Sequence, residues 1–274
     1  MPVRRLVAVL VGTALAGSLS VGTASGSVDA KTDAKKKVAP LQILVTNDDG
    51  VGAPGIDALV EGLRGVKGVK VTVIAPDVNK SGSGSNTTPG SLVTADATTA
   101  SGYPAIAVQG FPADSVIYAL DQGGAKKTPN LVISGINEGQ NLGKIADEIS
   151  GTVGAAKAAA VRGIPALGVS QGLLTGGEPD FETGVEAVLD WLAKNRKSLT
   201  PKKGKKIAVI LKNLNIPTCA IGEERGLFET AIAATTDGAV IDQNCESTLD
   251  NPTNDIEAFN NGYITLTDIP IPAG

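Results

Sequence analysis

Short apolar segments alternate with amphipathic segments along much of the chain. Residues 41–46 (LQILVT) and 69–75 (VKVTVIA) are brief runs rich in β-forming side chains, which is typical of buried parallel strands. Between them, from Pro54 onward, apolar residues recur at three- and four-residue spacing. This spacing predicts an amphipathic helix that begins at the proline. A strand, a helix and a second strand in this order form a βαβ unit.

The same alternation continues well beyond this unit and predicts an α/β fold. A loop rich in Gly, Ser, Asn and Thr occupies residues 76–90, and after about residue 213 the pattern weakens into β and loop segments. We therefore expect a doubly wound, mostly parallel sheet with right-handed crossovers, followed by a smaller β-rich C-terminal extension. Further strands are expected at residues 131–134, 164–170, 207–211 and 263–267, and further helices from Pro112, over 151–161 and over 181–194.

The N-terminal segment has the three parts of a secretory signal peptide. Arg4 and Arg5 precede a mostly apolar stretch over residues 6–19, and small residues follow it. This stretch is shorter than the roughly 20 residues that span a bilayer; an uncleaved membrane anchor is the alternative. We expect a secreted or otherwise extracytoplasmic protein without stable membrane insertion. The expected parts are a signal peptide (1–26), a polar leader (27–40) and one catalytic domain (41–274).

Composition narrows the chemistry that this chain can perform. It has no histidine and two cysteines among 274 residues. This excludes a His base, a Ser-His-Asp triad and a zinc site built from His or from several Cys. A formal net charge of -4 gives no case for binding a nucleic-acid duplex. If the protein uses a metal, the ligands must be oxygen atoms.

Export would place the two cysteines in an oxidising compartment. Cys219 and Cys245 would then be able to form a disulfide, which would stabilise the fold by roughly 3.5 kcal/mol in the chain-entropy model. The alternative is two free thiols that are buried separately. We expect the disulfide.

Three polar clusters follow strands of the expected sheet, at the edge where open α/β sheets bind ligands. The first, residues 47–50, places two carboxylates side by side, which repel each other unless a cation is present; a surface turn is the alternative. The second, residues 76–88, offers a backbone nest for an anion or is an ordinary flexible loop. The third, residues 134–141, leads to residues 150–152 at a helix start. That start suits phosphate but is also typical of simple helix capping.

Taken together, the three clusters describe a metal site. Asp48 and Asp49 supply carboxylates, Ser81 supplies a hydroxyl and Asn137 supplies an amide oxygen. Hard oxygen ligands of this kind suit Mg²⁺ or Mn²⁺, with Ca²⁺ as a further candidate. A divalent ion would offset the two carboxylates, polarise a phosphoryl oxygen and lower the pKa of a water molecule. Such a site supplies a nucleophile without histidine.

Six segments of the chain resemble the SurE family, the survival-protein phosphatases that act as 5'(3')-nucleotidases. They occur in the family's order and cover roughly residues 41–267. The NDDG and SGIN-x-G-x-NLG motifs together are highly specific for this family. The matching segments are ILVTNDDGVGAPGIDAL, VIAPDVNKSGSGSNTT, GFPADSVIYAL, NLVISGINEGQNLG, ISGTVGAAKAAAVRGIPALGVS and, more loosely, AFNNGYITLT.

The resemblance implies a Rossmann-like α/β domain that hydrolyses phosphate monoesters, typically nucleoside monophosphates, with a divalent metal at its site. The family's metal ligands fall on Asp48, Asp49, Ser81 and Asn137, and Asp48 is the residue expected closest to the chemistry. A small-molecule phosphate monoester is the expected partner, and a homodimer is the assembly to test. The resemblance places phosphate contacts on Asn141, Ser150, Gly151 and Thr152, and Asn47 and Asn86 are further candidates for substrate contacts.

Three positions depart from the family pattern. Gly52 stands where some members carry His, Phe111 where Thr is usual, and Ile149 where an aromatic residue is common. The departures at Phe111 and Ile149 keep a second hypothesis open, namely a non-catalytic module that binds a metal or phosphate on the same fold. Turnover of a phosphate ester distinguishes the two hypotheses.

Overall fold

The computed structural model describes residues 39–174, 177–200 and 204–273. Within those ranges, nine strands form one sheet in the order β3-β4-β2-β1-β5-β6-β7-β9-β8. Strands β4, β2, β1, β5, β6 and β7 run parallel, whereas β3 and β9 pair antiparallel with β4 and β7. The strands are β1 (Leu41–Thr46), β2 (Val69–Pro76), β3 (Val93–Thr98), β4 (Pro104–Gln109), β5 (Leu131–Glu138), β6 (Ala166–Gln171), β7 (Leu211–Ile216), β8 (Leu227–Glu229) and β9 (Ile264–Asp268).

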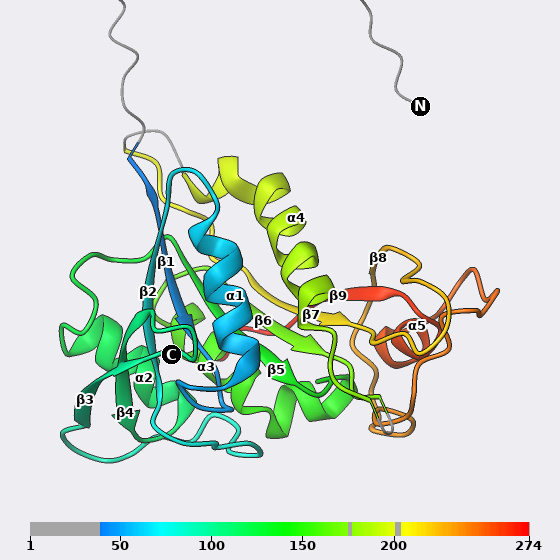
Figure 1. Cartoon of the computed structure of the whole chain (residues 1–274), viewed down its shortest axis with the longest axis horizontal. Coiled ribbons are helices and arrows are strands. Elements are labelled where there is room, and N and C mark those ends of the chain that lie inside the picture. The colour runs from blue at the N-terminus through cyan, green and yellow to red at the C-terminus, as the bar shows by residue number, and fades with distance from the viewer. Residues whose placement is uncertain (1–38, 175–176, 201–203, 274) are drawn as a thin grey trace, which may run out of the picture. The chain divides into compact units, whose positions relative to one another are not determined.

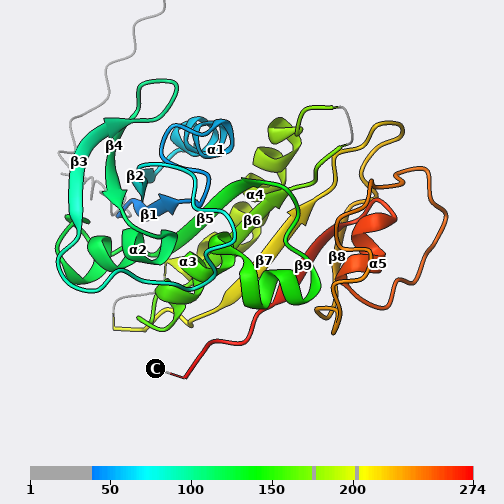
Figure 2. The ribbon, with the colours of Figure 1, turned by 90° about the horizontal axis from the view of Figure 1, so that it is seen from below.

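Helices cover both faces of this sheet (Figures 1 and 2). Helices α1 and α4 pack together on one face, and α2 and α3 on the other. Each face has its own apolar core, with Ile56 and Trp191 in the first and Val116 and Ala156 in the second. This arrangement confirms the predicted doubly wound α/β class. The helices are α1 (Pro54–Arg64), α2 (Pro112–Asp121), the π-helical turn η1 (Ile145–Ile149), α3 (Gly151–Ala160), α4 (Phe181–Leu199) and α5 (Asp255–Asn260).

Strand β1 lies at the point where the direction of strand addition reverses. From β1 the chain first passes to β2 on one side, and it later returns to β5 on the other side. In open α/β sheets, ligands bind in the crevice outside the carboxyl ends of the strands at such a switch point. The ends of β1 and β5 are therefore the first place to look for a site.

Four elements differ from the prediction, namely β7, β3, β4 and α5. The last parallel strand is β7 rather than residues 207–211, because Asn213 and Asn215 interrupt the apolar run that would mark it. The β3–β4 pair was not predicted, because β3 is a largely exposed edge strand whose apolar positions are mostly alanine. Helix α5 lies where β and loop were expected; the Asn254 side chain caps it by accepting a hydrogen bond from the Glu257 N–H.

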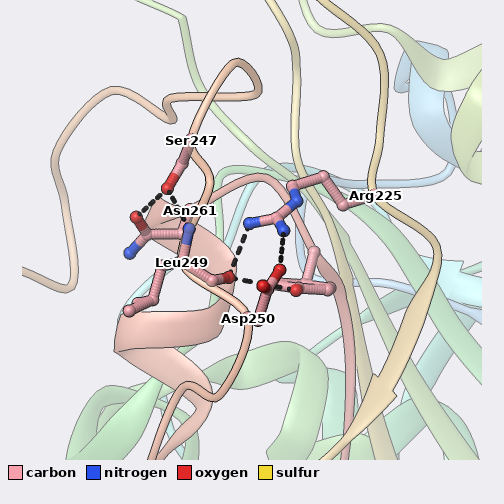
Figure 3. A network of polar contacts seen from close by, with 6 residues as sticks. Arg225, Ser247, Leu249, Asp250 and Asn261 are labelled. Carbon is pink, nitrogen blue, oxygen red and sulfur yellow. Dashed lines mark hydrogen bonds and ion pairs between the residues drawn. The ribbon is translucent and has the colours of Figure 1, made fainter.

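The chain makes an excursion after β7 and returns as β9, so that β8 and β9 extend the main sheet. A disulfide joins Cys219 to Cys245 within this excursion, with their Cα atoms 5.8 Å apart. Arg225 donates to the Leu249 carbonyl at 2.7 Å and pairs with the Asp250 carboxylate at 3.1 Å (Figure 3). Covalent and polar contacts thus hold the excursion together with its own small apolar cluster around Phe259.

The structure describes little of the expected N-terminal parts of the chain. The expected signal peptide (1–26), and the leader (27–40) except for its last two residues, lie outside the described residues. Leu41 begins β1 and is fully buried. In the part of the chain that the structure describes, no helix is both long and apolar enough to cross a bilayer.

Candidate functional site

The turn after β1 brings two carboxylates to the switch point between β1 and β5. Thr46 ends β1 in register with β5, and Asp48 and Asp49 follow it at the carboxyl edge of the sheet. Asn47 is fully buried; its Nδ2 donates to the Gly50 carbonyl at 2.9 Å, and its Oδ1 accepts from the Gly50 N–H at 3.3 Å. Asn47, expected as a substrate contact, is thus committed to the turn that presents the two aspartates.

Asp48 is buried against the start of α3, with 3% of its surface exposed. Thr152 Oγ1 donates to Asp48 Oδ1 at 2.6 Å, and a Cβ placed on Gly151 would lie 2.8 Å from Asp48 Cβ. The first turn of α3 therefore packs directly on this carboxylate, and the helix dipole favours negative charge there. Burial raises the pKa of Asp48, and the hydrogen bond from Thr152 offsets part of that rise.

Asp49 links three segments of the site. Asn79 Nδ2 donates to Asp49 Oδ1 at 3.2 Å, and the Glu138 N–H donates to Asp49 Oδ2 at 3.1 Å. The turn after β1 is thereby joined to the loop after β2 and to the end of β5. Burial and, second, the charge of Asp48 raise the pKa of Asp49 to about 6. A bound cation would stabilise both carboxylates in their charged form.

The loop after β2, residues 77–90, is anchored to the helices on one face of the sheet. The Gly84 N–H donates to the Ile149 carbonyl at 2.8 Å, and the Thr88 hydroxyl donates to a carboxylate of α2 at 2.7 Å. Gly154 allows α3 to approach this loop, because a Cβ there would overlap the Gly84 carbonyl. The loop therefore has a defined place beside the start of α3.

Three polar side chains of this loop lie in different surroundings. Ser83 Oγ is buried, has no hydrogen-bond partner among the described residues, and lies beside the contact between α3 and Asp48. Ser81 and Asn86 are exposed. The Ser81 N–H donates to Asn79 Oδ1 at 2.8 Å. The structure therefore brings Ser83 to the buried carboxylate, whereas the Ser81 and Asn86 side chains are exposed.

The third cluster contributes two asparagines from the end of β5 and the loop that follows. Asn137 Nδ2 donates to the Gly139 carbonyl at 2.5 Å, so Oδ1 is the atom that this side chain can offer to a cation. Asn141 Nδ2 donates to Ser170 Oγ at 2.8 Å and lies 3.4 Å from Thr152 Oγ1. The expected phosphate contact at Asn141 is thus connected through Thr152 to the buried carboxylate.

The three residues at the start of α3 that were expected to contact phosphate have different roles in the structure. Ser150 caps the helix, since its Oγ accepts from the Val153 N–H at 3.1 Å. Thr152 turns its hydroxyl to Asp48 instead. Gly151 allows the helix to approach Asp48 at all. Simple capping therefore accounts for one of the three residues.

The donor set of this site fits a hard divalent cation. Residues 39–174, 177–200 and 204–273 contain no group of three or more His, Cys, Asp or Glu that could hold a metal. A cation here would therefore bind the two aspartates together with neutral oxygen atoms. The unpartnered Ser83 hydroxyl shows that such an oxygen is already buried beside Asp48. Oxygen ligands alone suit Mg²⁺, Mn²⁺ and Ca²⁺.

Several residues of this network were not predicted. Asn79 and Ser83 occur in the loop that the sequence singled out, but nothing in the sequence ranks them above their neighbours. Asn213 and Asn215 carried a usable signal, because two asparagines two residues apart lie on one face of an otherwise buried strand. Both contact the loop that carries Asn141.

Comparison with known proteins gives a consistent result. A family model described as Survival protein SurE matches residues 43–237. The chain is 32% identical over 253 residues to a 5'-nucleotidase SurE of Synechococcus sp. (strain JA-3-3Ab), covering 84% of this chain and 91% of the relative. It is 45% identical over 152 residues to the 5'-nucleotidase SurE of Halobacterium salinarum (strain ATCC 29341 / DSM 671 / R1), covering 53% and 55% of the two chains. The crystal structure of the SurE protein from Aquifex aeolicus superposes with a TM-score of 0.63 at 27% identity, covering 85% of this chain and 94% of that one.

Proposed function

Because this chain belongs to the SurE family, we propose that it is a divalent-metal-dependent phosphomonoesterase that hydrolyses nucleoside monophosphates outside the cytoplasm. The observation that carries the proposal is the pair of buried or half-buried carboxylates at the switch point, with the start of α3 packed on one of them. The relatives' name, 5'-nucleotidase, supports the substrate class.

Each residue of the site has a distinct part in this proposal. Asp48 and Asp49 would hold the cation with Asn137 Oδ1 and, as the family resemblance implies, the Ser81 hydroxyl. Thr152 fixes the Asp48 carboxylate by donating to Oδ1. The first turn of α3 offers backbone N–H groups to the phosphate. Asp48 is the residue closest to the reacting phosphorus.

A bound divalent cation would supply the positive charge that neutralises the two aspartates and withdraws electrons from the phosphoryl group. Without that charge, the site repels its own substrate, because a phosphate dianion would approach two carboxylates. Burial raises the pKa of both carboxyls, and the charge of Asp48 adds to the rise at Asp49; a bound cation would offset both effects. The protein part of the site is thus arranged for an anionic substrate only once a cation is present.

Metal-dependent turnover is the direct test. Purified protein is assayed with nucleoside monophosphates and an aryl phosphate in Mg²⁺, Mn²⁺, Ca²⁺ or EDTA. We expect phosphate release with Mg²⁺ or Mn²⁺, a loss of at least about a hundredfold in EDTA, and recovery when the metal is restored. Thermal stabilisation by the metal without any release of phosphate would instead support a non-catalytic binding module.

The proposed location rests on two features, the signal-like pattern of residues 1–26 and the disulfide between Cys219 and Cys245. Disulfides form and persist mainly in oxidising compartments outside the cytosol. Protein recovered from outside the cytoplasm should begin near residue 27, and Ellman titration of the unfolded protein should find no free thiol.

Reduction of this disulfide should destabilise the excursion after β7. The cysteines lie 26 residues apart, so the chain-entropy model gives a loss of about 3.5 kcal/mol in the free energy of unfolding. Denaturant unfolding with and without dithiothreitol measures the loss. The double variant Cys219→Ala and Cys245→Ala is the control, because dithiothreitol should not change its stability. An equal response of both proteins to the reductant would contradict a stabilising bridge.

A further inference from the structure

Two asparagines of β7 form hydrogen bonds with the backbone N–H and carbonyl of Asn141. The Asn141 N–H donates to Asn215 Oδ1 at 2.7 Å. Its carbonyl accepts from Asn213 Nδ2 at 2.8 Å and from Asn215 Nδ2 at 3.1 Å. Asn213 and Asn215 are both 0% exposed. The N–H and carbonyl of Asn141 are thus fixed by side chains of a strand 72 and 74 residues further along the chain.

The same asparagine leads directly to the buried aspartate. Asn141 Nδ2 donates to Ser170 Oγ at 2.8 Å and lies 3.4 Å from Thr152 Oγ1. Thr152 Oγ1 in turn donates to Asp48 Oδ1 at 2.6 Å. Ser170 and Thr152 are both 0% exposed. A continuous buried chain of hydrogen bonds therefore runs from β7 to the carboxylate that the proposed reaction uses.

Stability alone does not explain two asparagines in this strand. Asn213 Oδ1 is buried and has no hydrogen-bond partner among the described residues, and an unsatisfied buried acceptor costs about 1–3 kcal/mol. Branched apolar side chains are the usual choice for a parallel strand that is covered on both faces. The unpartnered Oδ1 of Asn213 therefore costs stability, while the two asparagine side chains together fix the loop that carries Asn141.

From this geometry we infer that Asn213 and Asn215 are positioning residues of the active site, with Asn215 the more important because it bonds both backbone groups of Asn141. This inference rests on the proposed function for its catalytic consequence. The two residues touch neither substrate nor metal. They act by holding Asn141, whose Nδ2 donates to Ser170 Oγ and Thr152 Oγ1 and so orients the Thr152 hydroxyl toward Asp48.

Replacing Asn215 with an apolar side chain of the same branched shape tests the inference. In Asn215→Leu we expect kcat/KM for an aryl phosphate with Mn²⁺ to fall by about tenfold or more, with a raised KM, because Asn141 would no longer hold Thr152 and the first turn of α3, where the phosphate is proposed to bind. The matched control is Thr265→Val. Thr265 pairs in register with Asn215, is 0% exposed and has an Oγ1 without a partner among the described residues. Thr265→Val should leave kcat and KM unchanged.

A merely structural role would give a different pattern. It would lower the amount of active enzyme and hence the apparent kcat, while KM stayed at the wild-type value; that split would overturn the inference. Combination with Asn141→Ala gives a second criterion. If Asn215 acts through the Asn141 side chain, Asn215→Leu should cost little more in the Asn141→Ala background, whereas equal losses in both backgrounds would contradict the route.

Hydrogen exchange separates this inference from the proposed function. The Asn141 amide donates to Asn215 Oδ1, so exchange in a peptide that covers residues 138–144 should quicken in Asn215→Leu and stay slow in Thr265→Val. Unchanged exchange in Asn215→Leu would overturn the inference even in an active enzyme. A wild-type protein that releases no phosphate would overturn the proposed function, while exchange would still decide whether Asn215 holds Asn141.

Discussion

Asp48→Asn should abolish phosphate release while the protein stays folded. The amide has the size of the carboxylate and can still accept the hydrogen bond that Thr152 Oγ1 donates at 2.6 Å. It cannot supply the negative charge that holds a cation beside Asp49. We expect kcat to fall by about a thousandfold or more, the scale seen when a residue of a cooperating catalytic set is removed. Turnover of an aryl phosphate with Mn²⁺ measures the loss.

The same variant should gain stability when no metal is present. Burial raises the pKa of Asp48 in the folded protein, so the ionised carboxyl disfavours folding at any pH above its unfolded value, including pH 7. A neutral amide removes that penalty, and it also removes the charge that raises the pKa of Asp49.

The order of the unfolding temperatures of Asp48→Asn and the wild type should therefore reverse when Mn²⁺ is added. Without metal, Asp48→Asn should unfold above the wild type. With Mn²⁺ at a hundred times its dissociation constant, the wild type should gain about 2.7 kcal/mol and the variant much less. Asp96→Asn, at an exposed aspartate on the edge strand β3, should follow the wild type in both conditions. Full activity or full metal response in Asp48→Asn would remove Asp48 from the site.

The sequence was informative where chemistry follows a strand directly. Asp48 and Asp49 stand right after an apolar run, and parallel topology alone brings the ends of neighbouring strands to one edge of a sheet. The doubly wound fold was predictable for the same reason, since apolar periodicity marks both its strands and its helices. The deeper burial of Asp48 than of Asp49 was not predictable, because the start of α3 buries Asp48 through packing between distant segments.

The remaining parts of the site depend on contacts that no local pattern encodes. Ser81 remains the ligand predicted from the Ser- and Gly-rich loop, but no sequence signal pointed to the burial of Ser83 beside Asp48. That burial depends on the anchoring of Gly84 to the segment before α3. The strand β7 was misplaced because its asparagines obscure the apolar pattern. The two buried asparagines that hold Asn141 thus interrupt the apolar pattern by which a strand is identified in a sequence. Such interruptions are common where a strand contributes to a site as well as to a core.

Gly151→Ala should reduce catalysis by moving Asp48 without removing it. A Cβ at Gly151 would lie 2.8 Å from Asp48 Cβ, and 2.9 Å from both Asp48 Oδ2 and Ser83 Oγ. Real Cβ atoms essentially never approach other atoms this closely. The two oxygens can rotate away, but Asp48 Cβ is fixed to the backbone of the turn, so the turn and α3 must separate. A displacement of about 1 Å at a catalytic group lowers the rate by about a hundredfold.

The matched control for this variant is Gly52→Ala, in the same turn region. A Cβ at Gly52 meets nothing within 4 Å, and its backbone conformation is one that alanine adopts readily, so kcat and KM should equal those of the wild type. Forcing the turn and α3 apart costs stability as well, and the higher helix propensity of alanine offsets at most about 1 kcal/mol of that cost; activity is therefore measured at a temperature well below the unfolding of the variant. If Gly151→Ala instead keeps the wild-type kcat/KM, close packing of α3 on Asp48 is not required for turnover, and Asp48 must act from a position that tolerates a shift of the helix.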